Sequence, residues 1–124
     1  MTHYLTVQTV IRIHDEIIQL DGGLPGIRDK NLLESALEVP KANMFGHEVY
    51  PTLEDKASAY LYHITQNHPF NDANKRTACT SSMFFLDING VEQTVSEDCL
   101  LDAVLKVAKG EMTKEELSLL LKGV

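Results

Sequence analysis

Apolar side chains recur along this chain every three or four residues, the spacing that places them on one face of an α-helix. No segment shows the strict alternation of apolar and polar residues that a half-buried strand requires. Six segments carry the helical pattern: Val7 to Ile18, Leu32 to Leu37, Ala57 to Ile64, Ala78 to Leu86, Leu100 to Ala108 and Leu117 to Leu121. The pattern therefore predicts an all-α fold, a compact bundle of about six helices in a single domain spanning residues 1–124.

Capping residues and helix breakers give the expected helix boundaries. N-terminal capping signals precede four segments, at Asp29, at Thr52 with Asp55, at Ser96 and at Thr113 with Glu116. Stop signals follow at Gly22-Gly23, before Pro40, near Asn67 before Pro69, at Asn89-Gly90 and at Gly110. Residues 41–51 show no clear period, so we predict a loop or a short irregular turn of helix there. We expect the helix after residue 74 to be the central one.

Nine consecutive residues stand out between the third and fourth predicted helices: His68-Pro69-Phe70-Asn71-Asp72-Ala73-Asn74-Lys75-Arg76. They bring a base, a carboxylate, an amide and two cations together where a proline ends a helix. A helix that begins at or near Asn74 leaves its first N–H groups without intrahelical partners, and such a helix end attracts phosphate. We therefore interpret this stretch as a phosphate-handling active site.

Each polar residue of the stretch has a candidate role. His68 can take a proton from an attacking hydroxyl, because imidazole exchanges protons near neutral pH. Asp72 can hold Mg²⁺ against the phosphates. Ala73 is small enough to let a phosphate oxygen approach the main chain, and Lys75 and Arg76 add positive charge beside it. A hydroxyl nucleophile is the implied second substrate.

Taken singly, the same residues have structural explanations. His68 alone would only terminate its helix, Asp72 alone would be an ordinary cap, and Lys75 with Arg76 would form a solvated face. Their combination favours a functional site. Phe70 is assigned to the core in either interpretation, as the anchor of the loop.

Other candidate residues receive structural interpretations. His14 lies on an apolar helix stripe, which favours a hydrogen-bonded structural histidine over a catalytic one. Cys79 and Cys99 have no CxxC or Cys/His spacing, so we expect two small buried hydrophobic residues and neither a disulfide nor a zinc site.

Charge and hydropathy exclude further classes of function. Eighteen acidic residues against eleven basic ones give a formal charge of −7, which repels a polyanion except where cations cluster. No stretch approaches the roughly 20 apolar residues of a membrane span, and the N-terminus lacks the pattern of a signal peptide. We therefore expect a cytoplasmic protein that binds neither nucleic acid directly nor a membrane.

The nine residues resemble the signature HxFx(D/E)(A/G)N(K/G)R of the Fic/Doc family, and most closely its Doc, or death-on-curing, branch. The resemblance extends to His14-Asp15, to Gly22-Gly23-Leu24-Pro25-Gly26 and to the short length of the chain. It covers most of the sequence. The family's fold is a small helical bundle, which agrees with the pattern of apolar residues.

The resemblance also implies roles for the site residues and for ATP with Mg²⁺. His68 is expected to act as the general base and Asp72 to bind Mg²⁺. Asn74, with the neighbouring amides and Arg76, is expected to hold the nucleotide phosphates.

Two positions separate the branches of the family. Typical Fic enzymes, which transfer AMP to a protein hydroxyl, carry glycine at the position of Lys75 and a second arginine at the position of Cys79. That arginine pairs with the γ-phosphate and orients ATP. Doc proteins share the lysine and lack the second arginine, and they transfer the γ-phosphate to a threonine of elongation factor Tu, which stops translation.

The resemblance therefore implies a toxin that phosphorylates a protein hydroxyl. It also implies a small antitoxin whose C-terminal segment fills a groove of the toxin. AMP transfer remains the alternative enzymatic interpretation. A partner-binding module without enzymatic activity is the other alternative.

Overall fold

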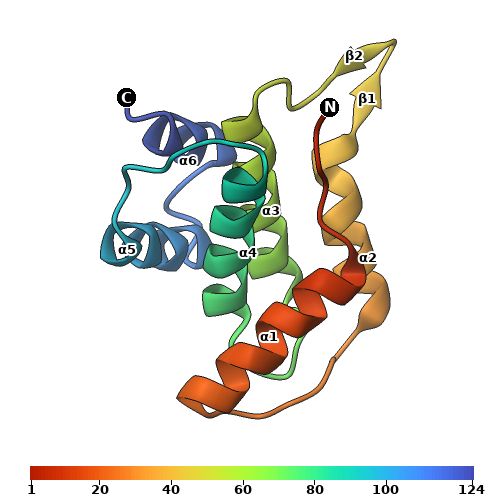
Figure 1. Cartoon of the computed structure of the whole chain (residues 1–124), viewed down its shortest axis with the longest axis vertical. Coiled ribbons are helices and arrows are strands. Elements are labelled where there is room, and N and C mark those ends of the chain that lie inside the picture. The colour runs from red at the N-terminus through yellow and green to blue at the C-terminus, as the bar shows by residue number, and fades with distance from the viewer.

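The computed structural model describes all 124 residues, and it confirms the all-α bundle (Figure 1). The helices are α1 (Val7–Asp21), α2 (Lys30–Glu38), α3 (Leu53–Asn67), α4 (Asn74–Ile88), α5 (Glu97–Ala108) and α6 (Lys114–Leu121). None of them is both long enough and apolar enough to cross a membrane.

The predicted capping residues begin their helices as expected. The side chains of Asp29, Thr52, Ser96 and Thr113 each accept a backbone N–H from the first turn of α2, α3, α5 and α6, in that order. Thr6, which carried no prediction, caps α1 in the same way. The α2 helix ends at Glu38, before Pro40, and Pro40 itself lies in a short 3₁₀ turn, Val39–Lys41.

The prediction of a loop or irregular helical turn for residues 41–51 was wrong in part. Two short antiparallel strands, β1 (Asn43–Met44) and β2 (His47–Glu48), form a hairpin there. Both strands are exposed throughout, so no buried face imposes an alternating pattern on the sequence. The turn uses left-handed backbone at Phe45 (φ 53°) and Gly46 (φ 82°).

The central helix is α3, not α4 as the sequence suggested. It packs against α2, α4, α5 and α6, whereas α4 contacts α1, α3 and α5. Small side chains at Ala57, Ser58 and Ala59 are buried and let neighbouring helices approach α3 closely. One side of α4 remains at the surface, where Phe84 is 39% exposed although its spacing placed it on the inner stripe.

The two cysteines differ in burial. Both are free thiols, and Cys79 lies in the core as predicted. Cys99 is exposed, which contradicts the prediction of a buried residue. The inner face of α5 is formed by Leu100 and by residues three or four positions apart from it, and Cys99 lies about 100° around the helix from Leu100.

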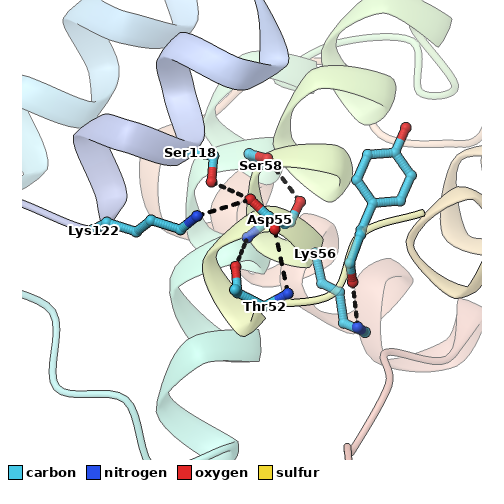
Figure 2. Close-up of polar contacts among 7 residues, drawn as sticks. Thr52, Asp55, Lys56, Ser58, Ser118 and Lys122 are labelled. Atoms are coloured by element: carbon cyan, nitrogen blue, oxygen red, sulfur yellow. Dashed lines mark hydrogen bonds and ion pairs between the residues drawn. The ribbon is translucent and has the colours of Figure 1, made fainter. Parts of the chain in front are cut away.

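A polar junction joins the start of α3 to α6, at the end of the bundle away from the nine-residue stretch (Figure 2). Asp55 and Thr52 form a reciprocal capping box. The Asp55 carboxylate also accepts hydrogen bonds from the Ser118 hydroxyl and from Lys122 Nζ, at 2.5 and 3.3 Å. Burial by itself raises the pKa of Asp55, but the hydrogen bonds from Ser118, Thr52 and Lys122 outweigh it and lower the pKa below the ordinary 3.8.

Replacement of Asp55 should therefore destabilise the bundle. We expect Asp55→Ala to lower the free energy of unfolding at pH 7 by about 1–3 kcal/mol, since it removes a helix cap and leaves the Ser118 hydroxyl without its acceptor. Thermal unfolding followed by circular dichroism measures the change. Asp87→Ala, at an exposed aspartate on α4, is the control and should change stability by no more than about 0.5 kcal/mol.

The lowered pKa of Asp55 predicts that its contribution to the free energy of unfolding depends on pH. Because the folded-state pKa of Asp55 lies below 3.8, its stabilisation is complete above that value and is lost as the pH falls through the folded pKa. The difference between the wild-type protein and Asp55→Ala should shrink over that acid range. A difference in the free energy of unfolding that stays constant down to the lowest pH at which both proteins fold would contradict a lowered pKa for Asp55.

Candidate active site

The nine-residue stretch forms the connection between α3 and α4. His68, at the C-terminal end of α3, and Ala73, immediately before α4, both adopt left-handed backbone, with φ of 52° and 60°. Residues with a side chain adopt this conformation rarely, because it costs about 1–2 kcal/mol at each position. Contacts from the rest of the protein must therefore stabilise the loop.

Asn74 closes the loop on itself. Its side-chain oxygen accepts the Phe70 N–H at 2.9 Å, and its side-chain nitrogen donates to the Phe70 carbonyl oxygen at 3.0 Å. Both residues are buried, which confirms Phe70 as a core anchor. The resemblance assigns Asn74 to the nucleotide phosphates. With the side-chain oxygen and one amide hydrogen engaged in the loop, its backbone N–H and the second amide hydrogen remain for an anion.

The turn between α1 and α2 supports the loop from the other side. The Pro69 carbonyl oxygen accepts the N–H groups of Arg28 and Asp29 at 2.7 and 3.0 Å, and the Asn71 N–H donates to the Gly26 oxygen at 3.1 Å. Both segments lie at the same end of the molecule, opposite the hairpin (Figure 1). The sequence marks Gly22-Gly23 as a helix stop and residues 22–26 as part of the family resemblance, but neither feature predicts this contact.

The Asp72 carboxylate is held by backbone amides. One oxygen accepts the Leu24 N–H at 3.1 Å and the other accepts the Ala73 N–H at 2.8 Å. These two hydrogen bonds lower the pKa of Asp72, and the bond from Leu24 has the larger effect. The Asp72 carboxylate lies so close to the main chain of residue 23 that this residue must be glycine. A Cβ on Gly23 would lie 2.8 Å from the carboxylate, and the φ of Gly23 is +125°, which favours glycine.

This carboxylate fits the requirements of a Mg²⁺ ligand. It is exposed and ionised, and each oxygen accepts one hydrogen bond, which leaves lone pairs for a cation. No group of three or more histidine, cysteine or acidic side chains is gathered anywhere in the chain. Mg²⁺ bound to nucleotides typically uses one or two carboxylates together with phosphate and water oxygens, so a single aspartate suffices.

The predicted site residues line one open cavity of about 310 Å³, together with Asn71 and Leu101: His68, Asp72, Ala73, Asn74, Lys75 and Arg76. The first turn of α4 begins here, and the N–H groups of Asn74, Lys75 and Arg76 have no backbone acceptor. Free amides and two cations give the cavity the character of an anion site, in a chain whose overall charge is −7.

Arg76 already has an acidic partner. Its Nη1 lies 2.5 Å from the Asp21 carboxylate at the end of α1, and both side chains are about half exposed, at 48% and 44%. Exposed ion pairs of this kind contribute only about 0–1 kcal/mol. A phosphate that offers two or three oxygens can therefore replace Asp21 as the partner of Arg76.

Arg28 fixes the main chain at His68. Its guanidinium donates to the carbonyl oxygens of His68 and Asn67, at 2.7 and 2.9 Å. A cation at this position satisfies the last carbonyl groups of α3 and complements the negative end of its dipole. The His68 side chain itself is exposed and faces the cavity. No sequence pattern marked Arg28, because its partners are backbone atoms 39 and 40 residues away.

Two further residues that the sequence singled out lie inside the fold. His14 is 1% exposed, and its Nε2 lies 2.9 Å from the main-chain oxygen of Asp72, which confirms a hydrogen-bonded structural histidine. Cys79 is 4% exposed, and burial raises the pKa of its thiol to about 12. The position that carries the second arginine in typical Fic enzymes therefore holds a neutral, buried group.

Comparisons with known proteins show the family of the chain. The Fic/DOC family model matches residues 4–86. A Mycolicibacterium smegmatis protein named Toxin Doc is 34% identical over 119 residues, which cover 84% of this chain and 89% of that protein. A protein of Escherichia phage P1 named Protein kinase doc is 36% identical over 110 residues, covering 89% of this chain and 86% of its own. The chain belongs to the Fic/Doc family, in its Doc branch.

Proposed function

We propose that this chain is the toxin of a toxin–antitoxin pair and transfers the γ-phosphate of ATP to a protein hydroxyl. The names of the two relatives support a toxin and a kinase. The observation that carries the proposal is the single cavity that unites His68, Asp72, the cations and the free amides of α4. A threonine of elongation factor Tu is the proposed acceptor, on the basis of the resemblance to Doc proteins.

Phosphoryl transfer requires mainly positioning and neutralisation of charge. The N–H groups at the start of α4 hold phosphate oxygens, and Lys75 and Arg76 offset the negative charge of the phosphates. Asp72 would hold Mg²⁺, which when bound neutralises further phosphate charge.

His68 supplies the proton-transfer step. Its imidazole accepts the proton of the attacking hydroxyl as the oxygen approaches phosphorus, and ADP leaves with the displaced bridging oxygen. The side chain is accessible from solvent, so a hydroxyl on a protein surface can reach it. Arg28 holds the main chain from which the imidazole extends, and thereby limits its position relative to Asp72.

The orientation of ATP follows from Lys75 and Cys79. Lys75 occupies space that glycine leaves open in AMP transferases, and the buried Cys79 thiol supplies no positive charge for a distant γ-phosphate. The cations and free amides of the cavity lie at the start of α4, next to Asp72. The γ-phosphate therefore takes the position beside the nucleophile.

A labelling experiment tests this orientation. Incubation of the protein with elongation factor Tu, Mg²⁺ and ATP should transfer label from γ-labelled but not from α-labelled nucleotide, and mass spectrometry should find one added phosphate. Transfer of α-label with an AMP-sized mass increase would identify an AMP transferase instead. Absence of transfer to elongation factor Tu and to every protein of a cell lysate would favour the partner-binding module.

The base is tested by substitution. His68→Ala should reduce phosphate transfer by about 10²- to 10⁴-fold, the usual contribution of a general base, and should leave ATP affinity and the melting temperature near those of the wild-type protein. His47→Ala, at an exposed histidine of the hairpin, is the matched control and should retain full activity. Equal activities of the two variants would refute the assignment of His68.

The antitoxin is tested by co-expression. A small protein encoded beside this gene should bind through an amphipathic C-terminal segment that fills a groove between helices. Binding to the folded state alone stabilises a protein by about 2.7 kcal/mol at a ligand concentration 100 times Kd, so the complex should melt at a higher temperature than the isolated chain. An unchanged melting temperature, with no co-purified partner, would contradict a toxin–antitoxin context.

A further inference from the structure

The main chain of Asp72 is anchored by one side chain. Its carbonyl oxygen accepts a hydrogen bond from His14 Nε2 at 2.9 Å, across 58 positions of sequence. Neither backbone group of Asp72 has a backbone hydrogen-bond partner, whereas Pro69, Asn71 and Ala73 on either side all do. A carbonyl oxygen can only accept, so Nε2 of His14 must carry the proton in this contact.

The direction of this N–H is fixed by the packing of the ring. The His14 imidazole is stacked on the Phe70 ring with centroids 3.9 Å apart and planes within 6° of parallel. Both side chains are 1% exposed, so neither ring can turn without displacing the core. The other ring nitrogen, Nδ1, lies 3.8 Å from the exposed carboxylate of Asp15, which is beyond hydrogen-bonding distance and constrains the ring little.

The position of the Asp72 carboxylate depends on this anchor. The carboxylate of an aspartate is separated from Cα by a single methylene group and follows a displacement of the main chain, and the hydrogen bond from Leu24 already spans 3.1 Å. A shift of a few tenths of an ångström at the Asp72 carbonyl would lengthen and weaken that bond, and so loosen the hold on the carboxylate. His14 thus acts on the site through Asp72 without reaching the cavity, whose lining does not include it.

We propose that His14 is a positioning residue whose buried, Phe70-stacked imidazole orients the Asp72 carboxylate toward the substrate phosphates and their cation. This role rests on the proposed phosphate transfer and concerns the orientation of the same site. It assigns a task to the histidine of α1 beyond filling the core. Residues that orient a ligand-bearing carboxylate typically change metal affinity or activity by about 10- to 100-fold when replaced.

Two substitutions separate the hydrogen bond from the packing. His14→Phe keeps an aromatic ring against Phe70 and removes the donor. His14→Gln keeps an N–H near the position of Nε2 and removes the aromatic stack. The control is His63→Phe, the same change at a half-buried histidine whose Nε2 contacts Lys114 of α6 and not the loop.

The first readout needs neither ATP nor Mg²⁺. Amide hydrogen exchange of Leu24 and Ala73, followed by NMR on the isolated chain, reports whether the Asp72 carboxylate still accepts their N–H groups. We expect exchange to accelerate by about 10-fold in His14→Phe and to return most of the way to the wild-type rate in His14→Gln. His63→Phe should exchange as the wild-type protein does at both positions.

The second readout is the Mg²⁺ concentration that gives half-maximal phosphate transfer. It should rise by about 10- to 100-fold in His14→Phe and less in His14→Gln, with the KM for the protein acceptor unchanged in both. A purely structural role for His14 would lower the melting temperature without altering the Mg²⁺ requirement. Wild-type exchange rates and Mg²⁺ requirement in a folded His14→Phe protein would overturn the proposal, as would equal losses in both variants.

The hydrogen-exchange measurement remains informative even if the phosphate-transfer assay detects no activity. If the wild-type protein transfers no phosphate, the proposed function is wrong, and the exchange rates of Leu24 and Ala73 still decide whether His14 positions Asp72. If His14→Phe does not fold, the smaller His14→Leu, which also removes the donor, takes its place. Faster exchange of Leu24 and Ala73 in His14→Leu than in His14→Gln supports the role of the N–H, and equal rates in the two variants refute it.

Discussion

The connection between α3 and α4 contains two left-handed residues that bear side chains, His68 and Ala73, and the rest of the site depends on holding them in place. Such a strained backbone conformation persists only where the surrounding contacts stabilise it by more than the strain costs. Asn74 supplies those contacts from within the stretch, and the turn after α1 supplies them from outside. Without both, His68 and Asp72 would not face the same cavity.

The two helix ends that meet at this loop differ in whether their backbone groups have hydrogen-bond partners. The last carbonyl groups of α3 are satisfied by Arg28, whereas the first amides of α4 are left free. The negative end of one dipole is thereby offset, and the positive end of the other stays available to an anion. The proposed phosphate binding needs such a local positive end, because the overall charge of −7 would otherwise repel an anion.

The interactions that hold the site reach well beyond the nine residues. Gly23 admits the Asp72 carboxylate because it has no Cβ, Leu24 donates an N–H to that carboxylate, and His14 holds its main chain from the middle of α1. At the opposite end, Asp55 ties α6 to α3. Because α3 is packed between these two regions, the loop is mounted on a rigid helix rather than on flexible segments.

The six helices could be predicted from the sequence, because their boundaries depend on local chemistry. A capping side chain such as Asp29 or Thr52 bonds within its own first turn, so its effect does not need the rest of the protein. The α-helix before Pro40 ends at Glu38, although Val39 keeps right-handed helical dihedral angles in the 3₁₀ turn that follows. The hairpin at residues 43–48 escaped prediction because both its strands are exposed, and Cys99 was misplaced because a single residue step around α5 separates the buried face from the solvent.

The candidate site was also visible in the sequence, since its residues are contiguous and share one helix start. The contacts that each of them makes depend on the folded chain and could not be predicted from the sequence. It engages the Asn74 amide in the loop, pairs Arg76 with Asp21, and brings Arg28 and His14 to main-chain atoms far away in the sequence. A hydrogen bond to a backbone carbonyl places no demand on the identity of the residue that carries it, so such long-range supports leave no motif to recognise.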